Sequence, residues 1–400
     1  MSETDDGRPL ATILFVDDEP NVLQGIRRST RSMRDRWNIH VADSGPAGLE
    51  KLAELERIDV VVSDMRMPGM DGAEFLTEVR KHYPMTARII LSGQADRDSI
   101  FRAIGPAHQY LAKPCDTEEL IRIIDRIWAS GDGLLCEPVS HLVGQVDRLP
   151  SPPELFIRIN DIMETDDWSL TELASVLEED VGMTATVLKL VNSSFFGFYN
   201  RVETVEQAIS LLGIETVKGV VLGEQMYQEE PVLAEWLDLE ALGVRSQAAA
   251  HVARALALRA GEPPSVAAEA FVGGVVNEVG LMVMARLDEV PETVAETLNE
   301  LVDTEIEWAI FGGSRFRVSA HLLNLWGFSA DLVAAIGALD ETPPRELEGL
   351  GWYLAAARHL VALDGFNVDR LVSGDGEPPG LDEILDAFRR GEANEMAVAT

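Results

Sequence analysis

Five short, almost wholly apolar runs divide residues 11–130, and helical patterns lie between them. The runs are Ile13–Val16, His40–Ala42, Val60–Ser63, Arg88–Ser92 and Gln109–Ala112. Short apolar strands of this kind are typical of a parallel sheet that helices bury on both faces. Residues 11–130 therefore predict an α/β domain with a five-stranded, doubly wound parallel sheet.

Polar side chains gather where the predicted strands end. In chain order they are Asp17, Asp18, Asp64, Ser92 and Lys113. The carboxyl ends of parallel strands form the edge of an open sheet at which ligands bind. Three carboxylates at that edge would repel one another unless a hard divalent cation joined them, and Mg²⁺ prefers such oxygen ligands.

The same set of side chains has the chemistry of phosphoryl transfer. A carboxylate can act as a nucleophile toward phosphorus and become an aspartyl phosphate. A lysine and a hydroxyl can hold the oxygens of the transferred group. The residues alone therefore predict an edge that binds Mg²⁺ and accepts a phosphoryl group.

The segments ILFVDDEP, VVVSDMRMPGMDG, IILSG and YLAKP resemble the receiver domain of two-component response regulators in order and spacing. The resemblance implies a flavodoxin-like fold, with Asp64 as the phosphoacceptor. It also implies a set of Mg²⁺ ligands, which are Asp17, Asp18, Asp64 and the backbone carbonyl of Arg66.

Further roles follow from the same resemblance. Ser92 and Lys113 are expected to contact the phosphoryl group, and Tyr110 occupies the position of the aromatic switch residue. The bond between Lys113 and Pro114 is expected to be cis. The implied partner is a sensor histidine kinase or a phosphotransfer protein.

The character of the chain changes after the predicted receiver domain. Gly, Asp and Pro are frequent after Trp128, so we expect a linker over residues 131–146. From Leu149 onward no strand pattern occurs, which predicts an all-α domain over residues 147–340. Residues 341–400 are expected to form a helical extension and a flexible tail.

Local signals predict several helices in this part. Ser169 with Glu172, and Thr204 with Gln207, have the spacing of capping boxes at helix starts. The stretch Val266–Ala285 is helical in pattern and apolar nearly all round, so it is expected to form a central helix.

Three segments of this part, LPSPPELFIRINDIM, LASVLEEDVGMTATVLKLVNSSFFGF and VETVEQAISLLGIETVKGVVL, resemble the HDOD domain, a helical output module related to HD-type phosphohydrolases. Those hydrolases need a His-Asp pair and further histidines to bind metal and activate water. At the corresponding positions this chain has Asn277, Glu278, Arg315, Leu339 and Asp340. We therefore expect no metal and no catalysis in this domain.

Charge bears on the possible partners. The chain has 33 basic and 68 acidic residues, a net charge of −35, of which −5 lies up to Ser130 and −30 beyond it. Such an acidic part repels nucleic acid and anionic lipid, and it has no basic recognition helix. An acid-rich, lysine-poor composition also fits a salt-rich cytoplasm, and the sequence leaves that alternative open.

These observations predict a cytoplasmic response regulator, since no apolar run is long enough to span a membrane and the N-terminus lacks a secretory signal. A histidine kinase would phosphorylate Asp64, and a non-catalytic HDOD domain would bind another protein; a homodimer is one assembly this allows. Two alternatives are a metal-dependent phosphohydrolase, such as a cyclic-dinucleotide phosphodiesterase, and a DNA-binding transcription regulator.

We also predict how the signal is transmitted. Phosphorylation is expected to act through Ser92 and Tyr110 on the helix Thr117–Trp128, which leads toward the helical domain. The result would be exposure of a protein-binding surface. Two independent domains on a flexible tether are the alternative.

Overall fold

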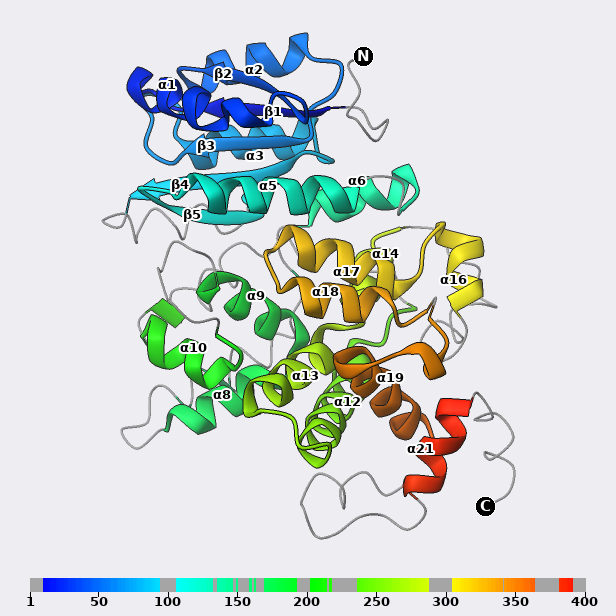
Figure 1. Ribbon diagram of the computed structural model, residues 1–400. Coiled ribbons are helices and arrows are strands. Elements are labelled where there is room, and N and C mark those ends of the chain that lie inside the picture. The colour runs from blue at the N-terminus through cyan, green and yellow to red at the C-terminus, as the bar shows by residue number, and fades with distance from the viewer. Residues whose placement is uncertain are drawn as a thin grey trace. The chain divides into compact units, whose positions relative to one another are not determined.

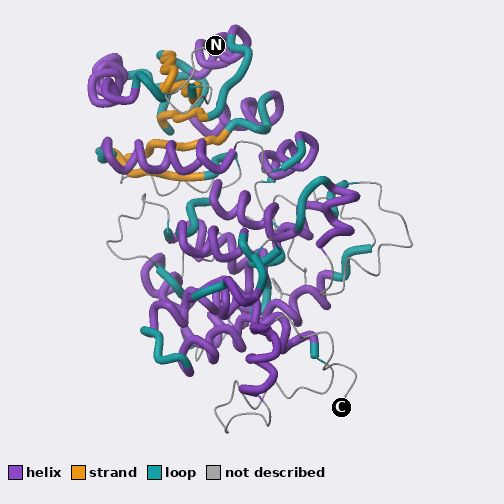
Figure 2. Tube along the Cα trace, turned by 45° about the vertical axis from the view of Figure 1, so that its right-hand side comes forward, coloured by secondary structure: helices purple, strands orange, loops and turns teal. Residues whose placement is uncertain are grey.

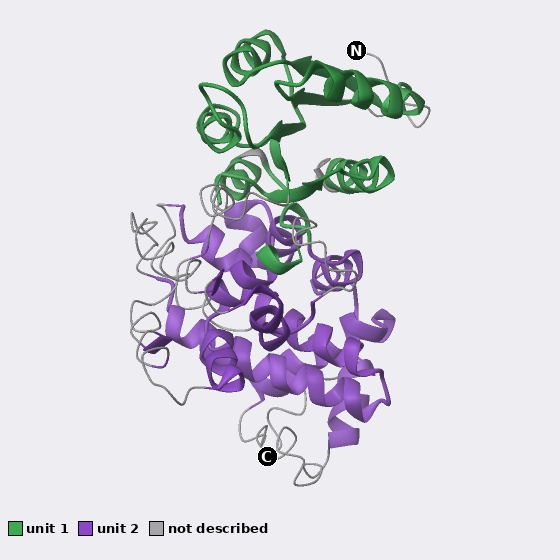
Figure 3. Cartoon of the chain, turned by 90° about the vertical axis from the view of Figure 1, so that its left-hand side faces the viewer, with its two compact units in different colours: residues 1–148, 189–201, 324–327 green, residues 149–188, 202–323, 328–400 purple. Residues whose placement is uncertain are grey.

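The computed structural model describes residues 10–93, 106–131, 135–146, 149, 158–159, 162, 169–192, 202–213, 216–217, 236–287, 304–340, 342–363 and 381–390 of the chain. The chain divides into two compact units (Figure 3). The first comprises residues 1–148 with the short segments 189–201 and 324–327. The second comprises residues 149–188, 202–323 and 328–400.

The first unit contains a five-stranded parallel sheet, drawn in orange in Figure 2. Its strands are β1 (Ala11–Val16), β2 (Trp37–Ala42), β3 (Val60–Asp64), β4 (Ala87–Gly93) and β5 (Gln109–Lys113). Their order is β2-β1-β3-β4-β5, and every neighbouring pair is parallel. This is the flavodoxin-like order, in which ligands bind at the carboxyl edge where the strand order reverses. The predicted fold of this part is confirmed.

Helices cover both faces of the sheet, with α1 and α5 in front of it and α3 behind it in Figure 1. The helices of this unit are α1 (Pro20–Ser29), the 3₁₀ helix η1 (Thr30–Met33), α2 (Gly45–Glu54), α3 (Gly72–His82), α5 (Thr117–Gly131) and α6 (Glu137–Gln145). Their starts follow local rules: α1 begins with a proline, and Asp71 and Glu74 form a capping box on α3. All five residues of β3 are buried, and these are three valines followed by Ser63 and Asp64 at the carboxyl end of the strand.

The expected linker over residues 131–146 contains α6, which packs against the rest of the first unit. The fully buried Arg88 of β4 donates to the carbonyl of Gly144 at 2.8 Å and to that of Pro106 at 2.6 Å. A Cβ atom on Gly144 would lie 1.9 Å from the carbonyl oxygen of Pro84, so only glycine permits this approach. Residues 135–146 therefore pack with the first unit, and the predicted domain boundary in this region stays a prediction.

The described secondary structure of the second unit is helical (Figure 1). Its helices are α8 (Leu170–Glu178), α9 (Val181–Val191), α10 (Val205–Leu212), α12 (Leu239–Arg259), α13 (Pro264–Val276), α14 (Val279–Met284), α16 (Thr304–Phe311), α17 (Arg315–Leu325), α18 (Ala330–Gly337), the 3₁₀ helix η3 (Pro344–Glu346), α19 (Gly349–Ala362) and α21 (Leu381–Arg390). The last residues of α9 and α17 are assigned to the first unit.

Two predicted helix starts are confirmed in this part. The hydroxyl of Ser169 accepts from the backbone N–H of Glu172 at 3.1 Å, and that of Thr204 accepts from Gln207 at 3.1 Å. One described stretch, Pro264–Met284, has the length and composition of a membrane span, but 83% of its apolar window is buried inside the protein. That burial is typical of a core helix in a folded domain.

The long helix predicted over Val266–Ala285 is interrupted. Helix α13 ends at Val276, α14 begins at Val279, and Glu278 between them leaves helical geometry with φ −107° and ψ 12°. The two residues at the break, Asn277 and Glu278, are 1% and 2% exposed. The predicted helical, buried stretch is therefore present as two helices, and the break between them was not predicted because apolar periodicity does not register a pair of buried polar residues.

Candidate functional site

The carboxyl edge of the sheet brings four predicted site residues to the ends of neighbouring strands. Asp64 is the last residue of β3 and Lys113 the last of β5, while Asp17 directly follows β1. In the register of the sheet, Asp64 lies beside Leu91, and the next residue, Ser92, lies beside Ala112. The local sequence thus places these side chains at one edge, as predicted.

Lys113 bridges two buried carboxylates at this edge. Its Nζ lies 2.7 Å from Oδ2 of Asp17 and also forms an ion pair with Oδ1 of Asp64. Burial raises the pKa of Asp64, and Lys113 offsets that effect only in part. Burial acts to lower the pKa of Lys113, but its hydrogen bonds to Asp17 and Asp64 outweigh it and the pKa is raised. Lys113 is therefore held as an ammonium ion between the two carboxylates.

Backbone groups orient the same carboxylates. The N–H of Glu19 donates to Oδ1 of Asp17 at 2.9 Å, and the N–H of Arg66 donates to Oδ2 of Asp64 at 3.0 Å. Behind Asp64, a Cβ atom on Gly72 would lie 2.2 Å from the carbonyl oxygen of Asp64. The loop that carries Asp64 therefore depends on glycine at this position. The expected cis bond between Lys113 and Pro114 is present.

The hydroxyl of Ser92 is buried at the same edge of the sheet. The residue is 1% exposed, and no described residue forms a hydrogen bond with its Oγ. A buried polar group without a partner calls for an explanation, and an oxygen of a bound phosphoryl group would supply the missing acceptor. Asp18 is half-buried.

The aromatic ring of Tyr110 is also buried, with 1% of the residue exposed, and its hydroxyl donates to the carbonyl of Ala107 at 3.3 Å. Because the ring is already buried, turning it further inward would not remove more of it from solvent. The exchange between Ser92 and Tyr110 stays a prediction.

The donors at the edge are all oxygens, which suits Mg²⁺. Asp17, Asp18 and Asp64 would hold it together with the carbonyl of Arg66. Within the described ranges, however, no three Asp, Glu, His or Cys side chains are grouped to hold a metal, and Lys113 lies between Asp17 and Asp64. Lys113 thus occupies the space between two of the carboxylates that would hold Mg²⁺.

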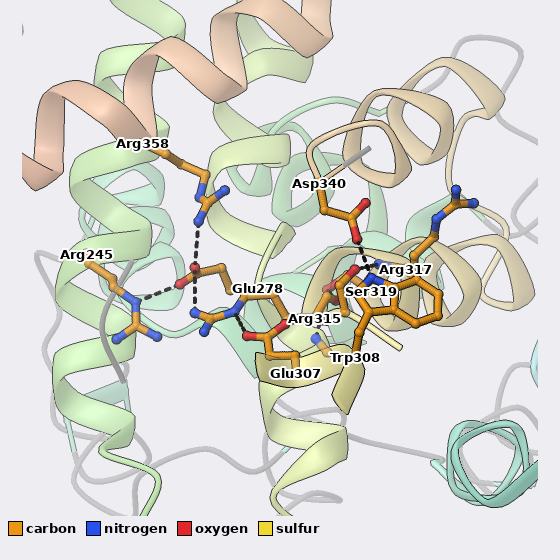
Figure 4. Close-up of polar contacts among 11 residues, drawn as sticks. Arg245, Glu278, Glu307, Trp308, Arg315, Arg317, Ser319, Asp340 and Arg358 are labelled. Atoms are coloured by element: carbon orange, nitrogen blue, oxygen red, sulfur yellow. Dashed lines mark hydrogen bonds and ion pairs between the residues drawn. The ribbon is translucent and has the colours of Figure 1, made fainter. Parts of the chain in front are cut away.

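The positions related to HD hydrolases lie in several places in the second unit. Asn277 and Glu278 form the break between α13 and α14, and Arg315 begins α17. Leu339 and Asp340 follow α18, and Oδ2 of Asp340 accepts from the indole nitrogen of Trp308 at 3.2 Å. The described contacts join Glu278 to Arg315 and give Asp340 a separate environment (Figure 4).

Three arginines bind the carboxylate of Glu278 (Figure 4). The distances to its oxygens are 2.6 Å from Nε of Arg245, 3.2 Å from Nη1 of Arg315 and 3.4 Å from Nη2 of Arg358. Burial alone would raise the pKa of Glu278, but the three guanidinium groups lower it to about 2. Glu278 is thus ionised and occupied by cations of the chain itself.

Arg315 joins Glu278 to a second buried carboxylate. Its backbone N–H donates to Oε2 of Glu307 at 2.6 Å, and its Nε forms an ion pair with Oε1 of the same residue. Glu307 is fully buried and Arg315 is 2% exposed. Burial raises the pKa of Glu307 despite the adjacent guanidinium. We call this set the arginine–glutamate cluster; its members are Arg245, Glu278, Glu307, Arg315 and Arg358.

Sequence reasoning missed three members of the cluster, which are Arg245, Glu307 and Arg358. The available signal was a charged residue inside a largely apolar helical segment, as in TEIEWAIF around Glu307. Such a residue is either solvent-exposed or paired in the core. Choosing between those two requires the positions of helices that are distant in sequence.

Two protein-family models match the chain. The response regulator receiver domain matches residues 13–125, and the HDOD domain matches residues 149–342. Among curated proteins, the hydrogenase transcriptional regulatory protein HoxA of Cupriavidus necator is 35% identical over 113 residues, which are 28% of this chain and 23% of that protein. The chain thus spans about a quarter of the length of the curated relatives it matches.

Solved structures with similarity to the chain include a receiver domain and a response regulator. The signal receiver domain of an HD domain-containing protein from Pseudomonas fluorescens is 30% identical and covers 31% of this chain and 98% of its own, with a TM-score of 0.29. The MmoQ response regulator of Methylococcus capsulatus is 20% identical and covers 63% of this chain and 98% of its own, with a TM-score of 0.46. The two family matches, in this order along one chain, identify the protein as a response regulator with an N-terminal receiver domain and a C-terminal HDOD domain.

Proposed function

We propose that this protein is a cytoplasmic, phosphorylation-controlled signalling protein. A histidine kinase or phosphotransfer protein phosphorylates Asp64, and the HDOD domain passes the signal on by binding another protein. The observation that carries the proposal is the buried carboxylate of Asp64, which is paired with Lys113 at the same edge as Ser92, whose hydroxyl has no hydrogen-bond partner among the described residues.

The chemistry assigned to these groups is a simple displacement. A carboxylate oxygen of Asp64 forms a bond to phosphorus while the bond between phosphorus and the donor nitrogen breaks, and the donor histidine recovers its electron pair. Lys113 leaves Asp17 and follows the phosphoryl oxygens, and Ser92 donates its hydroxyl hydrogen to one of them. Bound Mg²⁺ would neutralise negative charge on those oxygens.

The arginine–glutamate cluster supports a non-catalytic role for the HDOD domain. A hydrolytic metal would need free carboxylate and imidazole ligands at these positions. Glu278 is instead bound by three guanidinium groups, and Asn277 donates its amide to the carbonyl of Gly274 at 2.5 Å. We therefore favour protein binding over hydrolysis of a phosphodiester. The net charge of −30 beyond Ser130 argues against DNA as the partner.

A contact inside the first unit supports coupling between the phosphorylation site and the HDOD sequence. Gln109, the neighbour of Tyr110 on β5, donates its side-chain amide to the carbonyl of Leu325 at 3.0 Å. Leu325 lies within the HDOD match, yet belongs to the same compact unit as the sheet. Coupling between sites is typically worth 1–3 kcal/mol, so we expect partner affinity to change by roughly 5–150-fold on phosphorylation.

The first experiment tests Asp64. The full chain is incubated with acetyl phosphate and Mg²⁺, and phosphorylation is followed by mass spectrometry in the wild type, in Asp64→Asn and in the exposed control Asp35→Asn. We expect labelling in the wild type and control and none in Asp64→Asn, because an amide is not a nucleophile toward phosphorus. Equal labelling of Asp64→Asn contradicts the assignment.

A second experiment tests the role of the HDOD domain. Hydrogen exchange of the full chain is compared with and without beryllofluoride as a phosphoryl mimic, and hydrolysis of cyclic dinucleotides is assayed with divalent metals. We expect changed protection in residues 117–131 and within 149–342, and no turnover. Unchanged protection throughout supports independent domains on a tether. Turnover that Glu278→Ala abolishes supports the phosphodiesterase alternative.

A further inference from the structure

The chain continues past residue 342, where the HDOD match ends, with η3, α19 and α21. Helix α19 packs on α12, α13 and α18, which are helices of the matched domain. The approach to α13 is close, since a Cβ atom on Gly273 would lie 2.9 Å from the side chain of Leu354. On α19, Leu354 and Leu360 are 1% and 0% exposed. Helix α19 is therefore integrated into the core of the second unit.

Helix α19 also carries a member of the arginine–glutamate cluster. Nη2 of Arg358 lies 3.4 Å from Oε1 of Glu278, and its guanidinium carbon lies 4.1 Å from the centre of the Phe316 ring (Figure 4). The side chain of Arg358 is 14% exposed. Burial lowers the pKa of Arg358 to about 10, and Glu278 acts against that effect, so the group stays charged at neutral pH. Contact with the carboxylate of Glu278 and with the Phe316 ring offsets the cost of burying this guanidinium group.

Helix α21 contacts α19 through ring and guanidinium groups. The ring of Phe388 stacks on His359 at a centroid distance of 4.5 Å and an interplanar angle of 11°, and it lies 5.5 Å from the ring of Trp352. The guanidinium carbon of Arg389 lies 4.2 Å from the centre of the same Trp352 ring. His359 directly follows Arg358 in the chain. Helix α21 therefore contacts α19 next to the arginine that binds Glu278.

We propose that helices α19 and α21 together form a built-in lid over the positions that correspond to the metal site of HD-type hydrolases: α19 places Arg358 against Glu278, and α21 holds α19 in place. Arg358 is a positioning residue: its guanidinium group holds the carboxylate of Glu278, which lies at the break between α13 and α14. This inference rests on the non-catalytic role proposed for the HDOD domain and gives a structural basis for it. The geometry of the lid does not involve Asp64.

The test is a double-mutant cycle in the full chain, read by hydrogen exchange in peptides that cover residues 272–284. Arg358→Gln is expected to speed exchange there by about fivefold or more, within the range of coupling between contacting charges. In a Glu278→Gln background the same change should have less than about a twofold effect, because its partner charge is gone. The control Arg345→Gln removes an exposed arginine of η3 and should leave exchange unchanged.

Conservative and distant variants complete the test. Arg358→Lys keeps the charge and should restore most of the protection, which also identifies a folding failure of Arg358→Gln. Phe388→Ala should speed exchange in both α19 and residues 272–284, whereas Leu258→Ala, at an exposed position of α12, should not. Equal effects of Arg358→Gln in both backgrounds, or faster exchange confined to α21 in Phe388→Ala, would overturn the lid.

Phosphorylation of Asp64 by acetyl phosphate is measured in the same variants, and we expect it to be unaffected by changes in the lid. Loss of labelling in every protein, with the coupling between Arg358 and Glu278 intact, would refute the proposed function and leave the lid standing. Labelling without coupling would refute the lid alone.

Discussion

The depressed pKa of Glu278 predicts a specific dependence of stability on pH. The carboxyl ionises with a pKa of about 2 in the folded protein, against an ordinary value of 4.5. Because each pH unit of difference corresponds to about 1.4 kcal/mol, its ionisation contributes about 3 kcal/mol to folding at neutral pH. A lowered pKa means that this stability is fully present above about pH 4.5 and is lost as pH falls toward 2.

The assay is urea unfolding of the wild type and of Glu278→Gln, followed by tryptophan fluorescence near pH 7 and near pH 3. Near pH 7 the variant should be less stable by about 3–5 kcal/mol, because the substitution leaves three buried guanidinium groups without their shared carboxylate. Near pH 3 the gap should narrow by about 2 kcal/mol, since the wild type has by then lost part of its contribution.

The many other carboxyl groups titrate in both the wild type and Glu278→Gln. Their effect therefore cancels in the difference between the two free energies of unfolding. The exposed Glu346→Gln serves as a matched control and should unfold like the wild type at both pH values. A constant gap between wild type and Glu278→Gln from pH 7 to pH 3 would refute the reasoning, since it would mean that the arginines do not hold Glu278 ionised.

Three further changes test the receiver domain. Gly72→Ala places a Cβ atom against the carbonyl of Asp64 and should lower acetyl phosphate labelling at least about tenfold, whereas Gly25→Ala, in open space on α1, should not. Ser92→Ala should change the free energy of unfolding by less than about 0.5 kcal/mol, because the hydroxyl has no described partner, yet reduce labelling severalfold. Arg88→Met leaves buried carbonyl groups without their donor and should cost about 3 kcal/mol or more in urea unfolding.

The receiver fold could be predicted because its signals are local. A strand buried on both faces needs a short apolar run, and a helix start needs a capping side chain, so both are readable in a few adjacent residues. The cluster of charged side chains at the carboxyl edge could be predicted from the same signals, since Asp17, Asp64 and Lys113 each lie where a predicted strand ends. Parallel strands then bring those ends to one edge of the sheet.

The sequence alone therefore predicts the order of elements, the parallel sheet, the oxygen-rich edge around Asp64 and the absence of a His-Asp pair at Asn277 and Glu278. The contacts that Glu278 makes in place of a metal depend on the tertiary structure. Arg245, Arg315 and Arg358 come from helices far apart in the chain, and each is an ordinary charged residue in its own segment. Their role arises from packing, because a buried carboxylate must be paired and only the folded core sets which cations reach it.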